Sequence, residues 1–235
     1  MKPPSIASIQ IPTSAVFAYF FYIALGLAVG VLLIFFIGRQ FGGSITFLIG
    51  NSLLYAAAVF GHFRFAHGVS DWPPLEKGSL GKTIAWGLFM ALVGYVVVAY
   101  VSGAWMQNLQ GLDDSLHLRP EAQFRATSHY LNGTTARMIT ALDICIVAPI
   151  AEEIIFRSGV FRILKGRFSV TTAAAVSAVL FAISHRSVVA AVPFLVLGYL
   201  CCWTYEKTAD IRGPIVMHTG YNLIVTVPVL LGTHR

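Results

Sequence analysis

Six polar residues stand inside otherwise apolar stretches in the second half of the chain, and their types could perform acid–base chemistry. They are Glu152, Glu153, Arg157, His185, His218 and Asn222. A charged side chain at the centre of a bilayer costs at least about 2.5–3.5 kcal/mol. Such residues must therefore pair, lose their charge or line a wet cavity, and ionisable groups in this setting are usually functional.

The two glutamates and the arginine share one short segment, Ala151–Arg157. Glu153 and Arg157 are four residues apart, so on a helix they meet on one face in the favoured order. Glu152 points about 100° away from Glu153 around the helix axis. One carboxylate can therefore be held by Arg157 while Glu152 faces a separate environment, which makes Glu152 the better candidate for catalysis.

The two histidines and the asparagine offer complementary groups. His185 ends the stretch that begins at Phe181, and His218 and Asn222 are four residues apart on one helix face. An imidazole and a carboxamide so placed can both donate hydrogen bonds to one oxygen atom. A carboxylate, an imidazole and this pair form a set suited to water activation and oxyanion binding. Phe181 is predicted to pack.

Each feature also has a structural explanation. The Glu153–Arg157 ion pair is a common way for a span to tolerate charge, and His185 stands where an interfacial histidine is ordinary. His218 and Asn222 could simply join helices by hydrogen bonds. The remaining histidines stand in predicted loops or at the terminus and are assigned no role: His62, His67, His117, His129 and His234.

The elements that must position these residues have the composition of membrane spans. Of 235 residues, 57% are hydrophobic and 11% are charged, against about a quarter charged in soluble domains. The mean hydropathy is +0.75, and apolar runs near the roughly 20 residues that cross a bilayer recur. We therefore predict an all-α, polytopic transmembrane helix bundle with its active site in a cavity between the C-terminal helices. The seven predicted spans are 15–38, 44–61, 83–105, 138–160, 170–185, 188–206 and 213–232.

The whole chain, 1–235, is predicted to form a single membrane domain. The run 15–38 is longer than a signal-peptide core of about 7–15 residues, so it is expected to stay as the first span. The second span contains Asn51 and Tyr55. The segment 62–82 is predicted to be a loop. The polar segment 106–137 is predicted to hold an interfacial helix beginning near Pro120.

The charge pattern limits the partners and suggests an orientation. The net charge is +6, but lysine and arginine are scattered through short loops with no basic arm, so nucleic acid is not an expected partner. The bilayer is. Cationic residues are somewhat more frequent in the loops on the N-terminal side, which favours a cytoplasmic N-terminus. The three cysteines lie in apolar stretches and predict neither a disulfide framework nor a metal pair.

Read together, the polar motifs resemble the signature of the CAAX protease and bacteriocin-processing (CPBP) family. That family includes the type II CAAX prenyl endopeptidases, also called Ras-converting endopeptidases, and bacterial relatives. The matching motifs are Glu152-Glu153-x-x-x-Arg157, Phe181-x-x-x-His185 and His218-x-x-x-Asn222. The approach from Gly213 to His218 is similar as well. The resemblance divides the chain into variable N-terminal spans and loops, 1–135, and a CPBP-like catalytic core, 136–235.

This resemblance implies an intramembrane endopeptidase of a bacterial-type inner membrane. Its substrate would be a membrane-associated protein or peptide, with or without a prenylated CAAX terminus. Glu152 would activate water together with His185, and His218 and Asn222 would bind the oxyanion. The supporting residues would be Glu153, Arg157 and Phe181. No cofactor is expected, although Glu152, His185 and His218 could also form a zinc site; the His-Glu-x-x-His pair of common zinc proteases is absent from the sequence.

Two other functional classes remain open from the sequence. A non-catalytic membrane scaffold or a bacteriocin self-immunity protein could have the same fold and motifs. A transporter could use buried carboxylates as carriers, but the chain lacks the paired, broken-helix repeats of many transporters.

A shared site also requires Glu152, His185 and His218 to lie at the same depth in the membrane. Counted from the loop near Gly166, Glu152 and His185 fall at similar depths, whereas His218 would lie on the order of 10 Å shallower at 1.5 Å per residue. A shared site therefore predicts a recessed helix start near Gly213-Pro214, within a water-filled cavity.

Overall fold

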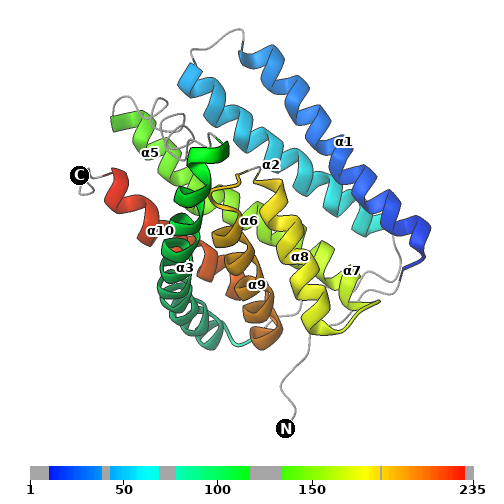
Figure 1. Cartoon of the computed structure of the whole chain (residues 1–235). Helices are drawn as coiled ribbons and strands as arrows, with labels where there is room; N and C mark the ends of the chain where they lie inside the picture. The colour runs from blue at the N-terminus through cyan, green and yellow to red at the C-terminus, as the bar shows by residue number, and fades with distance from the viewer. Residues whose placement is uncertain (1–10, 39–42, 69–77, 117–133, 186, 231–235) are drawn as a thin grey trace.

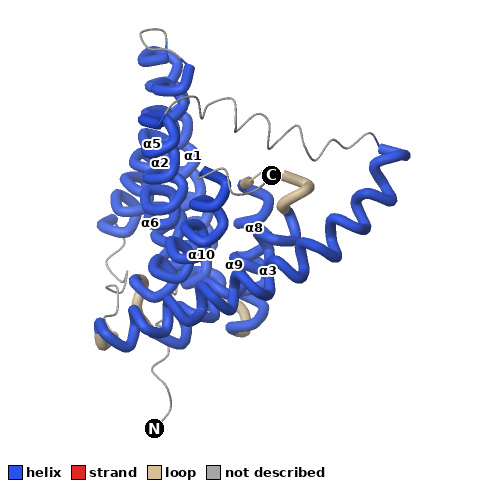
Figure 2. Tube along the Cα trace, turned by 90° about the vertical axis from the view of Figure 1, so that its left-hand side faces the viewer, coloured by secondary structure: helices blue, strands red, loops and turns tan. Residues whose placement is uncertain are grey.

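The computed structural model describes residues 11–38, 43–68, 78–116, 134–185 and 187–230, and all regular structure in these ranges is helical (Figures 1 and 2). The predicted all-α bundle is confirmed. The α-helices are α1 Thr13–Gly38, α2 Gly43–Gly68, α3 Leu80–Leu116, α5 Thr134–Leu142, α6 Ala148–Glu153, α7 Arg162–Lys165, α8 Val170–Ser184, α9 Ala191–Thr208 and α10 Arg212–Leu230. Two π-helical segments are η1 Asp143–Val147 and η2 Ile154–Phe161.

Every predicted span falls on a helical stretch, but the predicted loop 62–82 is wrong at both ends. The helix α2 continues to Gly68 and α3 already begins at Leu80. His62 and His67 therefore lie in α2 and not in a loop. His62 is only 2% exposed and has two hydrogen-bond partners. These partners compensate the burial of its polar ring within the helix. The interfacial helix predicted near Pro120 lies outside the described residues, as do His117, His129 and His234.

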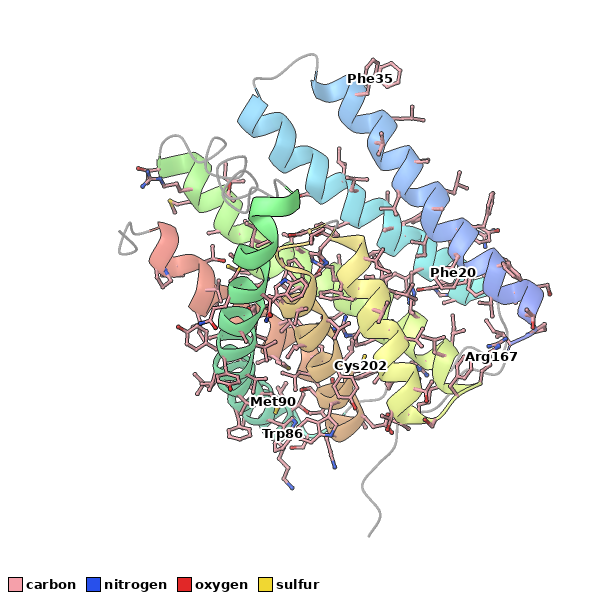
Figure 3. All side chains as sticks on the ribbon, in the orientation of Figure 1. Phe20, Phe35, Trp86, Met90, Arg167 and Cys202 are labelled. Carbon is pink, nitrogen blue, oxygen red and sulfur yellow. The ribbon has the colours of Figure 1, made fainter. Side chains whose placement is uncertain are left out.

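Among the described residues, two helices are long and apolar enough, by length and composition, to cross a bilayer. The qualifying stretches are Thr13–Leu32 in α1 and Leu80–Asn108 in α3, of 20 and 29 residues. Many of their large side chains face outward: Phe35 of α1 is 59% exposed and points away from the bundle (Figure 3), and Tyr100 of α3 is 81% exposed. An outward apolar surface of this kind suits a protein surrounded by lipid.

The segment from Thr134 to Lys165 forms one continuous helical path, which we call the central helix. It consists of α5, η1, α6, η2 and α7 in succession. Pi-helical turns are rare and often mark functional sites, and here they flank the short α6 that carries both glutamates. The central helix packs against α2, α8 and α10, while α3 lies against α9 and α10, and α1 lies along α2 (Figure 1).

A buried polar group ties α1 and α2 to the central helix. The Tyr19 hydroxyl donates to the Ile155 carbonyl at 3.1 Å, and Ser158 Oγ donates to the Ile154 carbonyl at 2.5 Å. Between them lies His62, with Nδ1 3.1 Å from the Tyr19 hydroxyl and Nε2 3.2 Å from Ser158 Oγ. Buried polar groups are tolerated when they are hydrogen-bonded, and these bonds fix the height of α2 against η2.

The last two helices are joined by a very short, buried turn. Ala209 has the left-handed backbone conformation at φ 49°, and Asp210 is 1% exposed. Gly213 and Pro214, in the first turn of α10, are buried as well. This burial does not test whether the helix starts deep within a water-filled cavity, so the recessed start stays a prediction.

Asp210 also clamps this turn to the start of α3. Its carboxylate accepts hydrogen bonds from the backbone N–H of Gly78 at 3.0 Å and of Arg212 at 2.9 Å, and from the Arg212 guanidinium. Burial alone would raise the pKa of Asp210, but the hydrogen bonds and the charge of Arg212 outweigh it and lower the pKa below the usual 3.8.

We expect Asp210 to make folding stability depend on pH in acid. Because the folded-state pKa is lowered, its stabilisation is fully present above the unfolded pKa of about 3.9 and is lost as pH falls through the folded value. Thermal midpoints of wild type and Asp210→Asn, measured from pH 3 to 7, should differ most above pH 5 and converge below about pH 4. A gap that stays constant with pH would contradict this assignment.

Gly159 should tolerate no side chain. A Cβ at this position would overlap the hydroxyl of the fully buried Tyr19 and reach 3.1 Å from His62 Nδ1. Overpacking of this kind typically costs about 1–3 kcal/mol, so Gly159→Ala should lower the thermal midpoint. Gly103→Ala is the matched control, because a Cβ there meets nothing within 4 Å, and alanine should hold or raise the midpoint in that helix.

Candidate active site

The structure brings Glu152 of α6, His185 at the end of α8 and His218 of α10 to one place. His185 Nε2 lies 3.9 Å from Glu152 Oε1, and His218 Nε2 lies 3.9 Å from Glu152 Oε2. The Glu152 side chain is 10% exposed, that of His185 21% and that of His218 3%. His218 is therefore within one side-chain length of Glu152, as the shared site requires.

The orientation of His185 is set by the backbone of its own helix. Its Nδ1 lies 2.8 Å from the Phe181 carbonyl, and a carbonyl oxygen can only accept a hydrogen bond. Nδ1 therefore carries a proton, and Nε2 faces Glu152. The ring is stacked on Phe194, with centroids 3.7 Å apart and planes inclined by 26°, which keeps it from swinging away.

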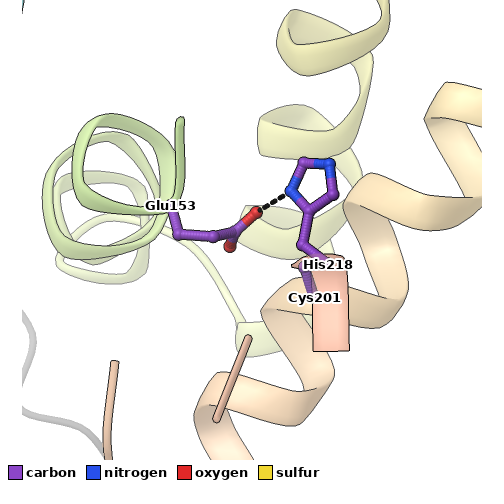
Figure 4. A group of neighbouring side chains, drawn as sticks. All are labelled: Glu153, Cys201 and His218. Carbon is purple, nitrogen blue, oxygen red and sulfur yellow. Dashed lines mark hydrogen bonds and ion pairs between the residues drawn. The ribbon is translucent and has the colours of Figure 1, made fainter. Parts of the chain in front are cut away.

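The orientation of His218 is set by a buried carboxylate. His218 Nδ1 lies 2.8 Å from Glu153 Oε1 (Figure 4), while Glu153 Oε2 lies 2.8 Å from Arg157 Nε. The second contact is an ion pair by distance, although its atoms are not aligned as a hydrogen bond. Glu153 therefore bridges Arg157 and His218, and the predicted Glu153–Arg157 pair extends to the histidine.

Arg157 and Phe181 form the floor beneath this bridge. Arg157 is fully buried and donates from Nη2 to the Gly198 carbonyl of α9 at 3.1 Å. Its guanidinium carbon lies 4.8 Å from the centre of the Phe181 ring, a cation–π distance. The same ring lies 4.6 Å from His185 and 5.8 Å from His218. Phe181 thus contacts Arg157 and both histidines, so it packs at the centre of the group.

Asn222 occupies a different position from the one predicted. Its Nδ2 donates to the carbonyl of Ile144 in η1 at 2.8 Å. Within the described residues, the structure gives it no hydrogen bond to Glu152 or to either histidine. It lies one turn beyond His218 and retains a second amide N–H, but its observed contact joins α10 to the central helix.

Glu152, His185 and His218 offer the donor types that zinc accepts, but not its spacing. Ligand atoms about 2.1 Å from a tetrahedral zinc lie roughly 3.4 Å apart, whereas the two contacts to Glu152 are each 3.9 Å. The ligand atoms of Glu153, Cys201 and His218 lie within 4.8 Å of one another (Figure 4). There the glutamate is already paired with Arg157, whose positive charge opposes a cation.

The α2 helix makes two polar contacts with the central helix that the sequence motifs do not predict. The Tyr55 hydroxyl donates to Glu152 Oε1 at 2.7 Å, and Ser52 Oγ donates to Asp143 Oδ1 at 3.2 Å. Polar residues three apart in an apolar span were a signal that could have singled out this face. None of the family motifs extends into the N-terminal half, so they gave no indication of this face.

Comparison with known proteins finds a family match for this part of the chain. Residues 134–224 match the family model described as type II CAAX prenyl endopeptidase Rce1-like. This stretch is therefore similar to an Rce1-like domain. The domain contains all of the predicted site residues, which confirms the family resemblance read from the motifs, whereas Tyr55 and Ser52 lie outside it.

Curated relatives are distant. The chain is 26% identical over 152 residues to "Putative membrane peptidase YdiL" of Bacillus subtilis, covering 65% of this chain and 59% of that protein. It is 23% identical over 142 residues to UPF0177 protein YbdI of Lactococcus lactis, covering 58% of this chain and 74% of the relative. A second Lactococcus lactis protein, UPF0177 protein YxdF, is 30% identical over 79 residues, which are 33% of this chain and 43% of the relative.

The matched part spans less than two thirds of YdiL and of YxdF. No solved structure gives a significant match to the chain. These matches make the chain similar to membrane peptidases over its C-terminal part.

Removal of Arg157 should destabilise the protein far more than removal of a peripheral cation. Arg157→Met leaves the buried Glu153 without its counter-charge, and breaking such a pair typically costs about 3–5 kcal/mol. Lys165→Met is the matched control, because Lys165 pairs with Glu206 at 2.7 Å with both side chains partly exposed, and such pairs contribute about 1 kcal/mol or less. Thermal unfolding in one detergent would compare the two; equal losses would contradict the central role of Arg157.

Proposed function

We propose that this protein is an intramembrane endopeptidase that hydrolyses a peptide bond with water activated by Glu152 and His185. The observation that carries the proposal is the position of the Glu152 carboxylate between two imidazole Nε2 atoms, each 3.9 Å away, within an Rce1-like domain. The substrate class would be a membrane-associated protein or peptide, including prenylated CAAX termini. The proposed location is a bacterial-type inner membrane with a cytoplasmic N-terminus.

The spacing around Glu152 suits a shared proton donor. A distance of 3.9 Å is too long for a direct hydrogen bond, and neutral His185 and ionised Glu152 both face the gap with acceptor atoms. A water molecule between them would donate one hydrogen to each and keep a lone pair for attack. As its oxygen bonds to the scissile carbon, its proton passes to Glu152.

The charge balance of the site assigns a second role to His218. Two carboxylates, Glu152 and Glu153, stand against one arginine, and buried charges are costly unless compensated. A proton on His218, which faces both carboxylates, would neutralise the group. Its Nδ1–H would remain on Glu153, and its Nε2–H would be free to donate to the carbonyl oxygen as that oxygen becomes an oxyanion.

The remaining steps need no further group. When the tetrahedral intermediate collapses, the C–N bond breaks and Glu152 returns its proton to the leaving amine, which leaves an amine and a carboxylic acid as products. Asn222 would assist His218 through its second amide N–H. The mechanism uses no metal; if zinc were bound, Glu152, His185 and His218 would hold it, and it would supply Lewis-acid activation of water.

Substitution of Glu152 tests the proposal directly. Glu152→Gln retains shape but cannot accept the water proton, so cleavage should fall by at least about 100-fold while the thermal midpoint stays near that of wild type. Glu206→Gln is the matched control, because Glu206 pairs with Lys165 at the far end of the central helix. Normal cleavage by Glu152→Gln would end the proposal, and full biological activity without cleavage would favour a scaffold or self-immunity role.

The assay should use purified protein in detergent with a farnesylated CAAX peptide and an unprenylated peptide library side by side. Running each with and without a chelator separates the two chemistries. Unchanged activity supports the glutamate mechanism, whereas loss that zinc restores would assign the three side chains to a metal.

A further inference from the structure

The N-terminal half makes one direct contact with the proposed catalytic carboxylate. The Tyr55 hydroxyl of α2 donates to Glu152 Oε1 at 2.7 Å. Within the part of the chain that the structure describes, this is the one hydrogen bond to Glu152, since both imidazoles lie 3.9 Å away. A bond of this length from a hydroxyl to a carboxylate is charge-assisted and about twice as strong as a neutral one.

The face of α2 that carries Tyr55 is aligned with the central helix at several levels. Ser52, Tyr55 and His62 recur at spacings of three and seven residues, so they share one helix face. Their partners on the central helix, in the same order, are Asp143, Glu152 and Ser158. Because both sets ascend together, the two helices run parallel, and polar contacts above and below Tyr55 fix its height against Glu152.

The position of this hydroxyl answers a problem that the mechanism creates. Glu152 has a flexible side chain, and its Oε2 lies 3.9 Å from His218 Nε2. If His218 carries the proton that balances the site, an unrestrained Glu152 would move into a direct ion pair with it. That pair would occupy the oxyanion donor and take the carboxylate away from His185. The Tyr55 hydroxyl bonds to Oε1, the oxygen nearer His185, and this bond restrains the carboxylate against such a collapse.

We propose that Tyr55 is a positioning residue of the peptidase: it holds the Glu152 carboxylate on the His185 side, so that Glu152 can take the water proton while His218 stays free for the oxyanion. This inference rests on the proposed peptidase function. It also means that the active site is completed by a helix that precedes the Rce1-like domain.

The test compares two tyrosine-to-phenylalanine variants that each remove one hydroxyl directed at the central helix. The assay is cleavage of the farnesylated CAAX peptide, or of the library peptide that wild type cleaves fastest. Tyr55→Phe should lower kcat by about 10- to 100-fold, as expected for one hydrogen bond to a charged group, with KM within about threefold. Tyr19→Phe loses its bond to the Ile155 carbonyl, so it should lower the midpoint and leave kcat within about threefold.

A second measurement covers the case in which Tyr55→Phe does not fold. A difluorotyrosine at position 55 keeps the size and the hydroxyl but ionises at lower pH, and a phenolate cannot donate to a carboxylate. Its kcat should fall above the pH at which that phenol ionises, where the wild-type profile stays level. Superimposable profiles, or an unchanged kcat in Tyr55→Phe, would overturn the inference alone. Failure of wild type to cleave any peptide would overturn the proposed function and this inference with it.

Discussion

The bridge that Glu153 makes between Arg157 and His218 is the contact on which the rest of the site depends. A carboxylate with no exposed surface must be compensated where it stands, so an arginine and a histidine have to reach it from fixed directions. Arg157 extends onto Gly198 of α9, which ties a third helix to the same point. The need to compensate the buried charge of Glu153 thus explains why α8, α9 and α10 converge on the central helix at this point.

The central helix carries this requirement because its geometry changes on both sides of the glutamates. The α6 turn, Ala148–Glu153, is bounded by π-helical segments, whose wider turns change which side chains share a face. Glu152 and Glu153 are adjacent within the α-helical turn and point about 100° apart, so they have separate neighbours: one faces the gap between two imidazoles and the other faces the buried bridge. Hydroxyl groups of Tyr19 and Ser158 bond to backbone carbonyls at the start of η2 and stabilise this geometry.

Much of this arrangement could be predicted from the sequence, because the cost of burying charge makes polar residues in apolar helices conspicuous. That reasoning found the helices, the Glu153–Arg157 pair and the candidates Glu152, His185 and His218. It did not single out Tyr55, since a tyrosine in an apolar span costs little and belongs to none of the family motifs. It misplaced His62 in a loop, because its partners Tyr19 and Ser158 lie far away in sequence. The contact of Asn222 with a backbone carbonyl was equally invisible, since spacing shows which side chains share a face but not which main-chain atoms they meet.

The two histidines are oriented by different kinds of atom, and this sets how each can change as the sequence diverges. The proton on His185 is directed by the main-chain carbonyl of Phe181, an atom that every possible residue at that position supplies. The proton on His218 is directed by the side chain of Glu153, which a single substitution removes. Substitutions in α8 therefore leave the tautomer of His185 unchanged. By contrast, one substitution at Glu153 removes the group that orients His218. Under the proposed peptidase function, loss of activity in a diverged chain would be recognised first by a change at Glu153 or Glu152, with His185 still oriented as it is now.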